Sequence, residues 1–149
     1  MTRPRILGFT ALIMAIGGCH TSPHTSTTTI NEIENPPLQQ VGDRVFFAFD
    51  KSDISSDAQA ILSRQADFTK KYGQLTFTIE GHCDERGTRE YNLALGERRA
   101  VAAQNALVSL GVDARRLRTV SYGKERPAVE GHNDAAWAQN RRVVTIVNQ

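Results

Sequence analysis

The sequence has almost no excess of charge of either sign. Its 18 lysines and arginines stand against 16 aspartates and glutamates, and Arg3 and Arg5 near the start account for the net charge of +2. A general nucleic-acid binder needs a surplus of basic side chains on one face, because these neutralise phosphates. The composition therefore predicts no nucleic-acid partner.

The sequence also lacks a long apolar run. The run near the start, residues 6–16, is too short to cross a bilayer as a mature helix. Because arginines precede it and small residues follow it, it is typical of an export signal. Ile16-Gly17-Gly18-Cys19 resembles the lipobox of bacterial lipoproteins, in which the cysteine is acylated and becomes the first mature residue. We predict a signal peptide over residues 1–18 and lipidation of Cys19. The alternative is an ordinary secretory signal that is cut elsewhere.

Cysteine is scarce as well. Only Cys19 and Cys83 occur, so lipidation of Cys19 would leave Cys83 without an intramolecular partner. Cys83 falls on the apolar side of an alternating segment that includes Phe77 and Ile79. We therefore expect Cys83 to be a free thiol that burial protects.

Residues 19–44 form a predicted tether that leads to a folded domain at 45–149. Up to about Gln40 this segment is rich in serine, threonine and proline, and it has too few large apolar side chains to offset the entropy of ordering. About twenty such residues have a root-mean-square reach of roughly 25 Å. The whole chain, with 40% apolar and 23% charged residues, has the composition of a globular protein.

The domain alternates strand and helix patterns, which we separate by apolar spacing. This order predicts an α+β fold, a two-layer sandwich in which two main helices pack on a mixed sheet of about four strands. Both helices fit on one face, and the strand order is left open. The expected strands are 44–50, 75–83, 117–121 and 142–147, the main helices run from Ser55 or Ser56 to Tyr72 and over 91–110, and a short helix covers 135–140.

The segment Gly81–Thr88, GHCDERGT, gathers chemically versatile side chains. His82 and Cys83 point to opposite faces of their strand, and no second cysteine or histidine cluster has a suitable spacing, so we predict no metal site and no cofactor. A nucleophilic cysteine needs to be exposed, whereas Cys83 falls on the apolar side of its segment. Asp84 and Glu85 could act as an acid and a base, but no second carboxylate pair at a defined position supports glycoside hydrolysis. We therefore predict that the protein is not an enzyme.

Asp84 and Arg99 suit the recognition of a charged ligand. Asp84 lies where a strand ends, which is where sheets of α/β proteins commonly place ligands, and Arg99 lies on the following helix at the edge of its apolar stripe. A carboxylate accepts hydrogen bonds from an ammonium, and a guanidinium can grip a carboxylate with two N–H groups. The pair therefore suits an amino-acid-like zwitterion. Alternatively, Asp84 and Arg99 pair directly with each other and only pin the loop.

The segment Gly81–Ala100 closely resembles the signature of the OmpA-like peptidoglycan-binding domain, in particular that of its lipoprotein members, and Ser121–Pro127 and Trp137–Val143 look like later blocks of that family. The resemblance implies an OmpA-like sandwich that holds the diaminopimelate of the peptidoglycan stem peptide without covalent chemistry. It assigns the ligand's ammonium to Asp84 and its carboxylate to Arg99. It also implies supporting positions around the pocket: Phe49, Asp50, Asn92 and Leu95.

The resemblance also implies a place in the envelope and protein partners. It implies an outer-membrane lipoprotein, lipid-anchored with its domain facing the periplasm, that links the membrane to the cell wall. The implied partners are peptidoglycan, the propeller protein TolB and the Tol complex, with a role in envelope integrity and in constriction at division. The alternative is an OmpA-like wall-anchoring lipoprotein outside the Tol system.

Overall fold

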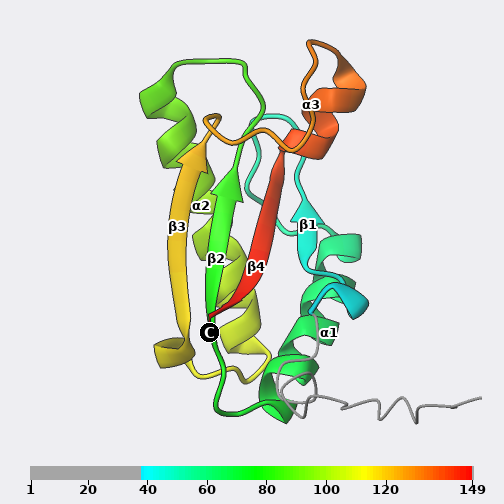
Figure 1. Ribbon diagram of the computed structural model, residues 1–149, viewed down its shortest axis with the longest axis vertical. Coiled ribbons are helices and arrows are strands. Elements are labelled where there is room, and N and C mark those ends of the chain that lie inside the picture. The colour runs from blue at the N-terminus through cyan, green and yellow to red at the C-terminus, as the bar shows by residue number, and fades with distance from the viewer. Residues whose placement is uncertain (1–37, 149) are drawn as a thin grey trace, which may run out of the picture. The chain divides into compact units, whose positions relative to one another are not determined.

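The computed structural model describes residues 38–148 (Figure 1). The predicted signal peptide, Cys19 and residues 19–37 of the tether lie outside this range. Among the described residues, no helix combines the length and apolar character needed to cross a membrane. The elements in chain order are the 3-10 turn η2 (Leu38–Gln40), β1 (Arg44–Phe46), α1 (Ser56–Lys71), β2 (Thr76–His82), α2 (Arg89–Ser109), the 3-10 turn η3 (Ala114–Arg116), β3 (Leu117–Gly123), α3 (Asp134–Asn140) and β4 (Arg142–Asn148).

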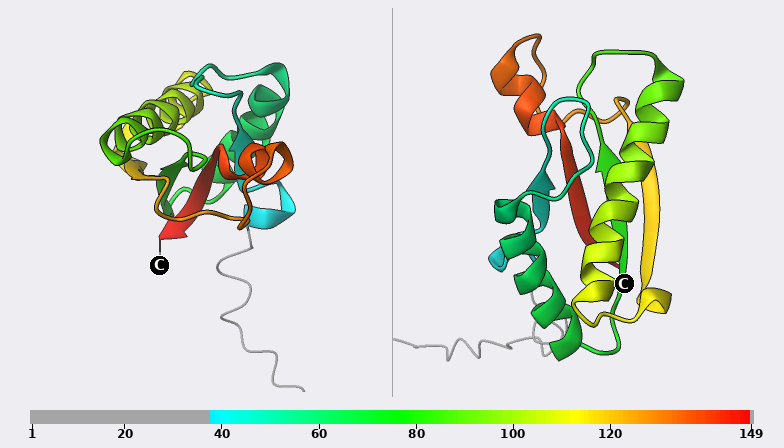
Figure 2. Two further views of the ribbon diagram at one scale, coloured as in Figure 1. Left: turned by 90° about the horizontal axis from the view of Figure 1, so that it is seen from above. Right: turned by 180° about the vertical axis from the view of Figure 1, so that it is seen from behind.

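The four strands form one mixed sheet in the order β1-β4-β2-β3. β4 pairs antiparallel with both β1 and β2, whereas β2 pairs parallel with β3. Helices α1 and α2 cover one face of this sheet, as the view from behind shows (Figure 2). The predicted two-layer α+β fold is confirmed. The order, which sequence reasoning left open, places β4 between β1 and β2.

Capping residues determine where the two main helices begin. Ser55 accepts a hydrogen bond from the backbone N–H of Ala58 at 3.2 Å, which confirms the predicted start of α1. Thr88 does the same for the N–H of Tyr91, so α2 begins at Arg89, two residues earlier than expected. The loop after β2 is therefore short and is held at its end by the first turn of α2.

The first strand is shorter than predicted. β1 ends at Phe46, because the backbone N–H of Phe47 donates to the carbonyl of Arg141 and the chain then turns, with the N–H of Lys51 donating to the carbonyl of Ala48. Asp50 within this turn has a φ of 56°, in the left-handed region. The expected strand at 44–50 is thus wrong beyond Phe46. Residues 47–50 instead form a loop beside the carboxyl end of β2.

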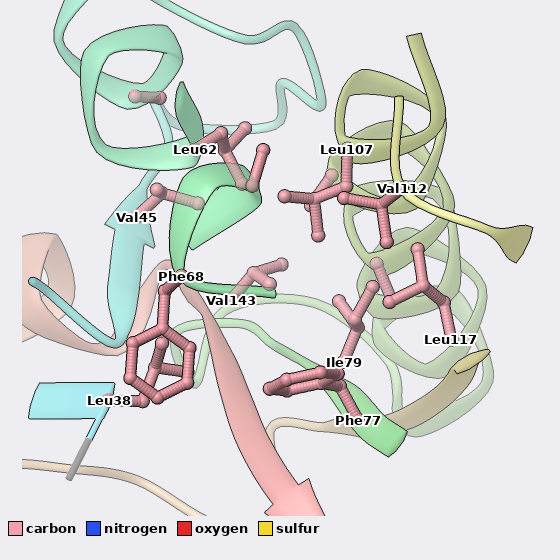
Figure 3. Close-up of a cluster of buried hydrophobic side chains, with 14 of the residues drawn as sticks. Leu38, Val45, Leu62, Phe68, Phe77, Ile79, Leu107, Val112, Leu117 and Val143 are labelled. Carbon is pink, nitrogen blue, oxygen red and sulfur yellow. The ribbon is translucent and has the colours of Figure 1, made fainter. Parts of the chain in front are cut away.

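The hydrophobic core lies between the sheet and the two helices (Figure 3). Leu38 belongs to it, although this residue lies within the predicted tether. Helix α2 approaches the sheet most closely at Gly81, where a Cβ would lie 1.9 Å from the carbonyl oxygen of Gly96. This contact places the first turns of α2 directly over the end of β2. Side chains with at most 1% exposure include Val45, Leu62, Phe77, Ile79, Leu107 and Val143.

Candidate functional site

A cavity of about 180 Å³ opens at the carboxyl end of β2, between the loop that follows β1 and the first turns of α2. This end of the molecule is at the top of Figure 1. All six residues that the resemblance assigned to a ligand pocket line this cavity, although they come from three separate segments. The lining residues are Phe49, Asp50, Cys83, Asp84, Arg86, Gly87, Tyr91, Asn92, Leu95 and Arg99.

Arg99 lies at the floor of the cavity and is 0% exposed. Its Nε donates to the carbonyl of Lys51 at 2.8 Å, Nη1 to that of His82 at 2.9 Å and Nη2 to that of Ala48 at 3.1 Å. A guanidinium has five N–H groups, so one on each terminal nitrogen remains without a partner in the described part of the chain. Burial lowers the pKa of Arg99, but an arginine stays protonated at neutral pH. A buried positive charge, with two N–H groups that these three carbonyls do not use, therefore lines the cavity next to the Cys83 thiol.

Asp84 does not pair with Arg99. Its Oδ2 lies 2.7 Å from Nη2 of Arg86 and 3.3 Å from Nη1 of Arg141, and its side chain is 4% exposed. Burial raises the pKa of Asp84, but the hydrogen bonds from Arg86 and Arg141 outweigh burial and hold this pKa below its ordinary value. The carboxylate is therefore ionised. The direct ion pair that the sequence left as an alternative does not form among the described residues.

Two arginines that sequence reasoning missed, Arg86 and Arg141, surround Asp84. The Arg86 guanidinium lies between two aromatic rings, 3.9 Å from the ring centre of Phe49 and 4.1 Å from that of Trp137. Nε of Arg141 donates to the carbonyl of Phe47 at 2.9 Å. A signal for both was present, because each lies within a segment that resembles the OmpA-like family. Spacing alone did not indicate that either would reach Asp84.

Asp50 supplies a second carboxylate at the rim of the cavity. Its left-handed backbone presents the side chain to Tyr91, whose hydroxyl donates to it. This hydrogen bond raises the pKa of Tyr91. Asp50 is exposed, unlike Asp84. The cavity thus carries one buried and one exposed carboxylate.

Asn92 and Cys83 add no charge to the cavity, but they hold the loop between β2 and α2 by hydrogen bonds. Nδ2 of Asn92 donates to the carbonyls of Arg86 and Thr88, at 2.8 and 3.0 Å, which ties the loop to the helix that follows it. Cys83 is a free thiol with 3% exposure, as expected, and donates to the carbonyl of Asn92 at 3.3 Å. Burial raises its pKa, which disfavours the reactive thiolate.

His82 points to the other face of β2, as predicted, and it is buried there. It is 2% exposed and stacks beside Tyr122. Neither of its ring nitrogens has a hydrogen-bond partner among residues 38–148. No group of three or more histidine, cysteine or acidic side chains that could hold a metal ion occurs within these residues.

Comparison with known proteins places this geometry in a family. The sequence model of the OmpA family matches residues 46–141. The chain is 57% identical over 108 residues to the peptidoglycan-associated lipoprotein of Brucella melitensis, a match that covers 72% of this chain and 64% of that protein. It is 50% identical over 107 residues to the protein of the same name from Haemophilus influenzae, with 72% and 70% covered. The chain thus spans less than two thirds of the length of the Brucella relative.

Solved structures agree with the fold. The crystal structure of the peptidoglycan-associated lipoprotein from Burkholderia pseudomallei matches with a TM-score of 0.69 and 44% identity, and the match covers 71% of this chain and 90% of that one. The C-terminal domain of Helicobacter pylori MotB matches with a TM-score of 0.67 at 21% identity, covering 72% and 84%. The second likeness concerns the fold alone.

Proposed function

The chain belongs to the OmpA family, and from that premise we propose that it is a peptidoglycan-binding lipoprotein whose cavity holds the diaminopimelate of the stem peptide. The binding is non-covalent. Its curated relatives carry the name peptidoglycan-associated lipoprotein, which supports the wall as the ligand.

The observation that carries this proposal is the charge arrangement of the cavity. Arg99 lines the cavity with a buried positive charge and has two N–H groups beyond those that bind the three carbonyls, which suits a ligand carboxylate. Asp84 and Asp50 line the same cavity with negative charge that suits an ammonium, and Leu95 and Phe49 add apolar surface. A volume of about 180 Å³ suits the end of one amino acid, because sites for drug-sized ligands are about 300 Å³ or more. Diaminopimelate ends in such a zwitterion.

The proposal extends to how the domain is held in the envelope. Acyl chains on Cys19 anchor the protein in the outer membrane, since each buried CH₂ contributes about 0.8 kcal/mol and two or more chains give stable attachment. The tether then keeps the domain near the wall, so that modest affinities combine through effective concentration. Partners of the Tol system, TolB first, and a role in constriction at division follow from the family resemblance.

Co-sedimentation with isolated cell-wall sacculi tests the proposed pocket. Asp84→Asn and Arg99→Lys should each abolish co-sedimentation of the purified domain while circular dichroism still shows a folded protein. Arg115→Gln, a change on the exposed surface away from the cavity, should sediment like the wild type. Retained sedimentation of both pocket variants would reject the assigned site. Release of soluble wall fragments during the incubation would instead indicate a hydrolase.

A further inference from the structure

The proposed function requires a free acceptor on Asp84, and the structure has none. Oδ1 of Asp84 accepts from the backbone N–H of Arg86 at 3.1 Å and from its Nε at 3.2 Å, and Oδ2 accepts from Nη2 of Arg86 at 2.7 Å and from Nη1 of Arg141 at 3.3 Å. A carboxylate has about four acceptor positions. A ligand ammonium therefore reaches Asp84 only if one of these donors leaves.

We propose that Arg86 is an internal competitor for the ligand: its guanidinium occupies the ammonium position beside Asp84 and leaves this carboxylate when a ligand binds. This inference rests on the proposed function, because it concerns the same cavity. It makes binding an exchange of one cation for another and makes Arg86 a residue that lowers affinity.

The contacts of the two arginines indicate which one leaves. Arg141 has a second hydrogen bond besides the one to Asp84, because its Nε donates to the carbonyl of Phe47. Its side chain is also only 15% exposed. The Arg86 side chain is 33% exposed, and its hydrogen bonds within the described chain go to Asp84 alone. Breaking that pair costs no other hydrogen bond of the side chain. The backbone N–H of Arg86 can also stay on Oδ1, so the loop need not unfold.

The aromatic rings around Arg86 offer the guanidinium a place to stay after the exchange. Phe49 and Trp137 lie on its two faces at 3.9 and 4.1 Å, and a guanidinium between rings gains cation–π attraction without an anion. Trp137 is itself positioned by its Nε1, which donates to Glu85 at 2.8 Å. A small rotation of the side chain within this stack would release Asp84.

The charges of the cavity also favour exchange over simple addition. Three guanidiniums, those of Arg86, Arg99 and Arg141, stand against the carboxylates of Asp84 and Asp50. An ammonium that adds to the filled site would bring a further positive charge beside Arg86 and Arg141. An ammonium that replaces the Arg86 guanidinium at Asp84 meets less repulsion, because the guanidinium moves away from the carboxylate within its stack.

The chain contains a matched control for the test. Asp113 and Arg115 repeat the spacing of Asp84 and Arg86, with the same set of hydrogen bonds from the backbone N–H, Nε and Nη2 of the arginine. That pair lies on the open surface, where the arginine side chain is 89% exposed. Arg115→Gln therefore removes an equivalent ion pair without touching the cavity.

The experiment uses the soluble tripeptide L-Ala-γ-D-Glu-meso-diaminopimelate and measures affinity by calorimetry. Arg86→Gln should bind it about fivefold more tightly than the wild type, as expected for the loss of a partly exposed competing ion pair. Arg115→Gln should bind like the wild type. Unchanged or weaker binding by Arg86→Gln would overturn the inference and leave the proposed function standing. Absence of binding by the wild type would overturn both.

The fluorescence of Trp137 gives a second readout that needs no variant. Trp137 is the single tryptophan of the chain, so its emission reports the stack on Arg86 directly. The emission of the wild type should change as the tripeptide saturates the site, and this change should be missing in Arg86→Gln. Binding that calorimetry detects without any change in the emission of the wild type would contradict the release of Arg86.

Discussion

Acidification should destabilise the domain through His82. Burial, followed by the positive charge of Arg142, lowers the pKa of His82 from 6.5 to about 4. The Arg126 backbone raises the pKa of His82 and outweighs the lowering effect of the Arg126 charge, and Glu80, with Oε2 3.7 Å from Nε2, also opposes the repulsion. Because the folded-state pKa is depressed, the unfolded chain takes up the proton first. Stability is therefore full above pH 6.5 and declines as the pH falls towards 4. The difference between a pKa of 6.5 in the unfolded chain and about 4 in the folded protein corresponds to roughly 3 kcal/mol.

Urea unfolding at pH 7 and pH 4.5 measures this effect. The free energy of unfolding of the wild type should fall by roughly 2 to 3 kcal/mol more than that of His82→Phe. The replacement removes no hydrogen bond, because the ring nitrogens have none among the described residues, and it keeps an aromatic ring beside Tyr122. Other titrating groups are common to both proteins and cancel in the comparison. Equal losses in the two proteins would show that His82 does not titrate differently on folding, and would refute the reasoning.

Two further substitutions test the contacts that shape the cavity. Gly81→Ala should lower the free energy of unfolding by at least about 2 kcal/mol, because the new Cβ would lie 1.9 Å from the carbonyl oxygen of Gly96 and force α2 off the sheet. A melting temperature within a degree of the wild type would contradict this prediction. Arg99→Lys should cost about 2 to 4 kcal/mol in urea unfolding, because one ammonium cannot reach all three carbonyls that the guanidinium joins, and each lost charged hydrogen bond contributes about 1.5 kcal/mol or more. A loss below about 0.5 kcal/mol would mean that Arg99 serves the ligand alone.

The helices and inner strands were predictable because their signals are local. Apolar spacing and the N-cap at Ser55 depend on residues within a few positions of one another, and α1 begins as expected. The first strand was predicted too long, because Phe47 is buried from a loop and its backbone N–H bonds to the carbonyl of Arg141. That partner is 94 residues away in the sequence, and no local pattern indicates it.

The positions around the cavity were predictable only through the family resemblance. Periodicity placed Arg99 at the edge of the apolar stripe of α2, and in the structure Arg99 and Asn92 are both buried. It did not bring Phe49 and Asp50 to the same place, because that depends on how the loop after β1 folds over the end of β2. The structure unites all six positions in one cavity.

The sequence by itself determined the alternation of strands and helices, the buried free thiol of Cys83 and the place of Arg99 at the edge of an apolar stripe, since each follows from residues a few positions apart. Only the tertiary structure decided the strand order, the burial of His82 and the partners of Asp84. The physical reason is that an ion pair depends on distances of a few ångströms between groups that the sheet brings together. Arg141 reaches Asp84 from 57 residues away because β4 lies beside β2. Arg86, two residues from Asp84, is held there by rings from two other segments.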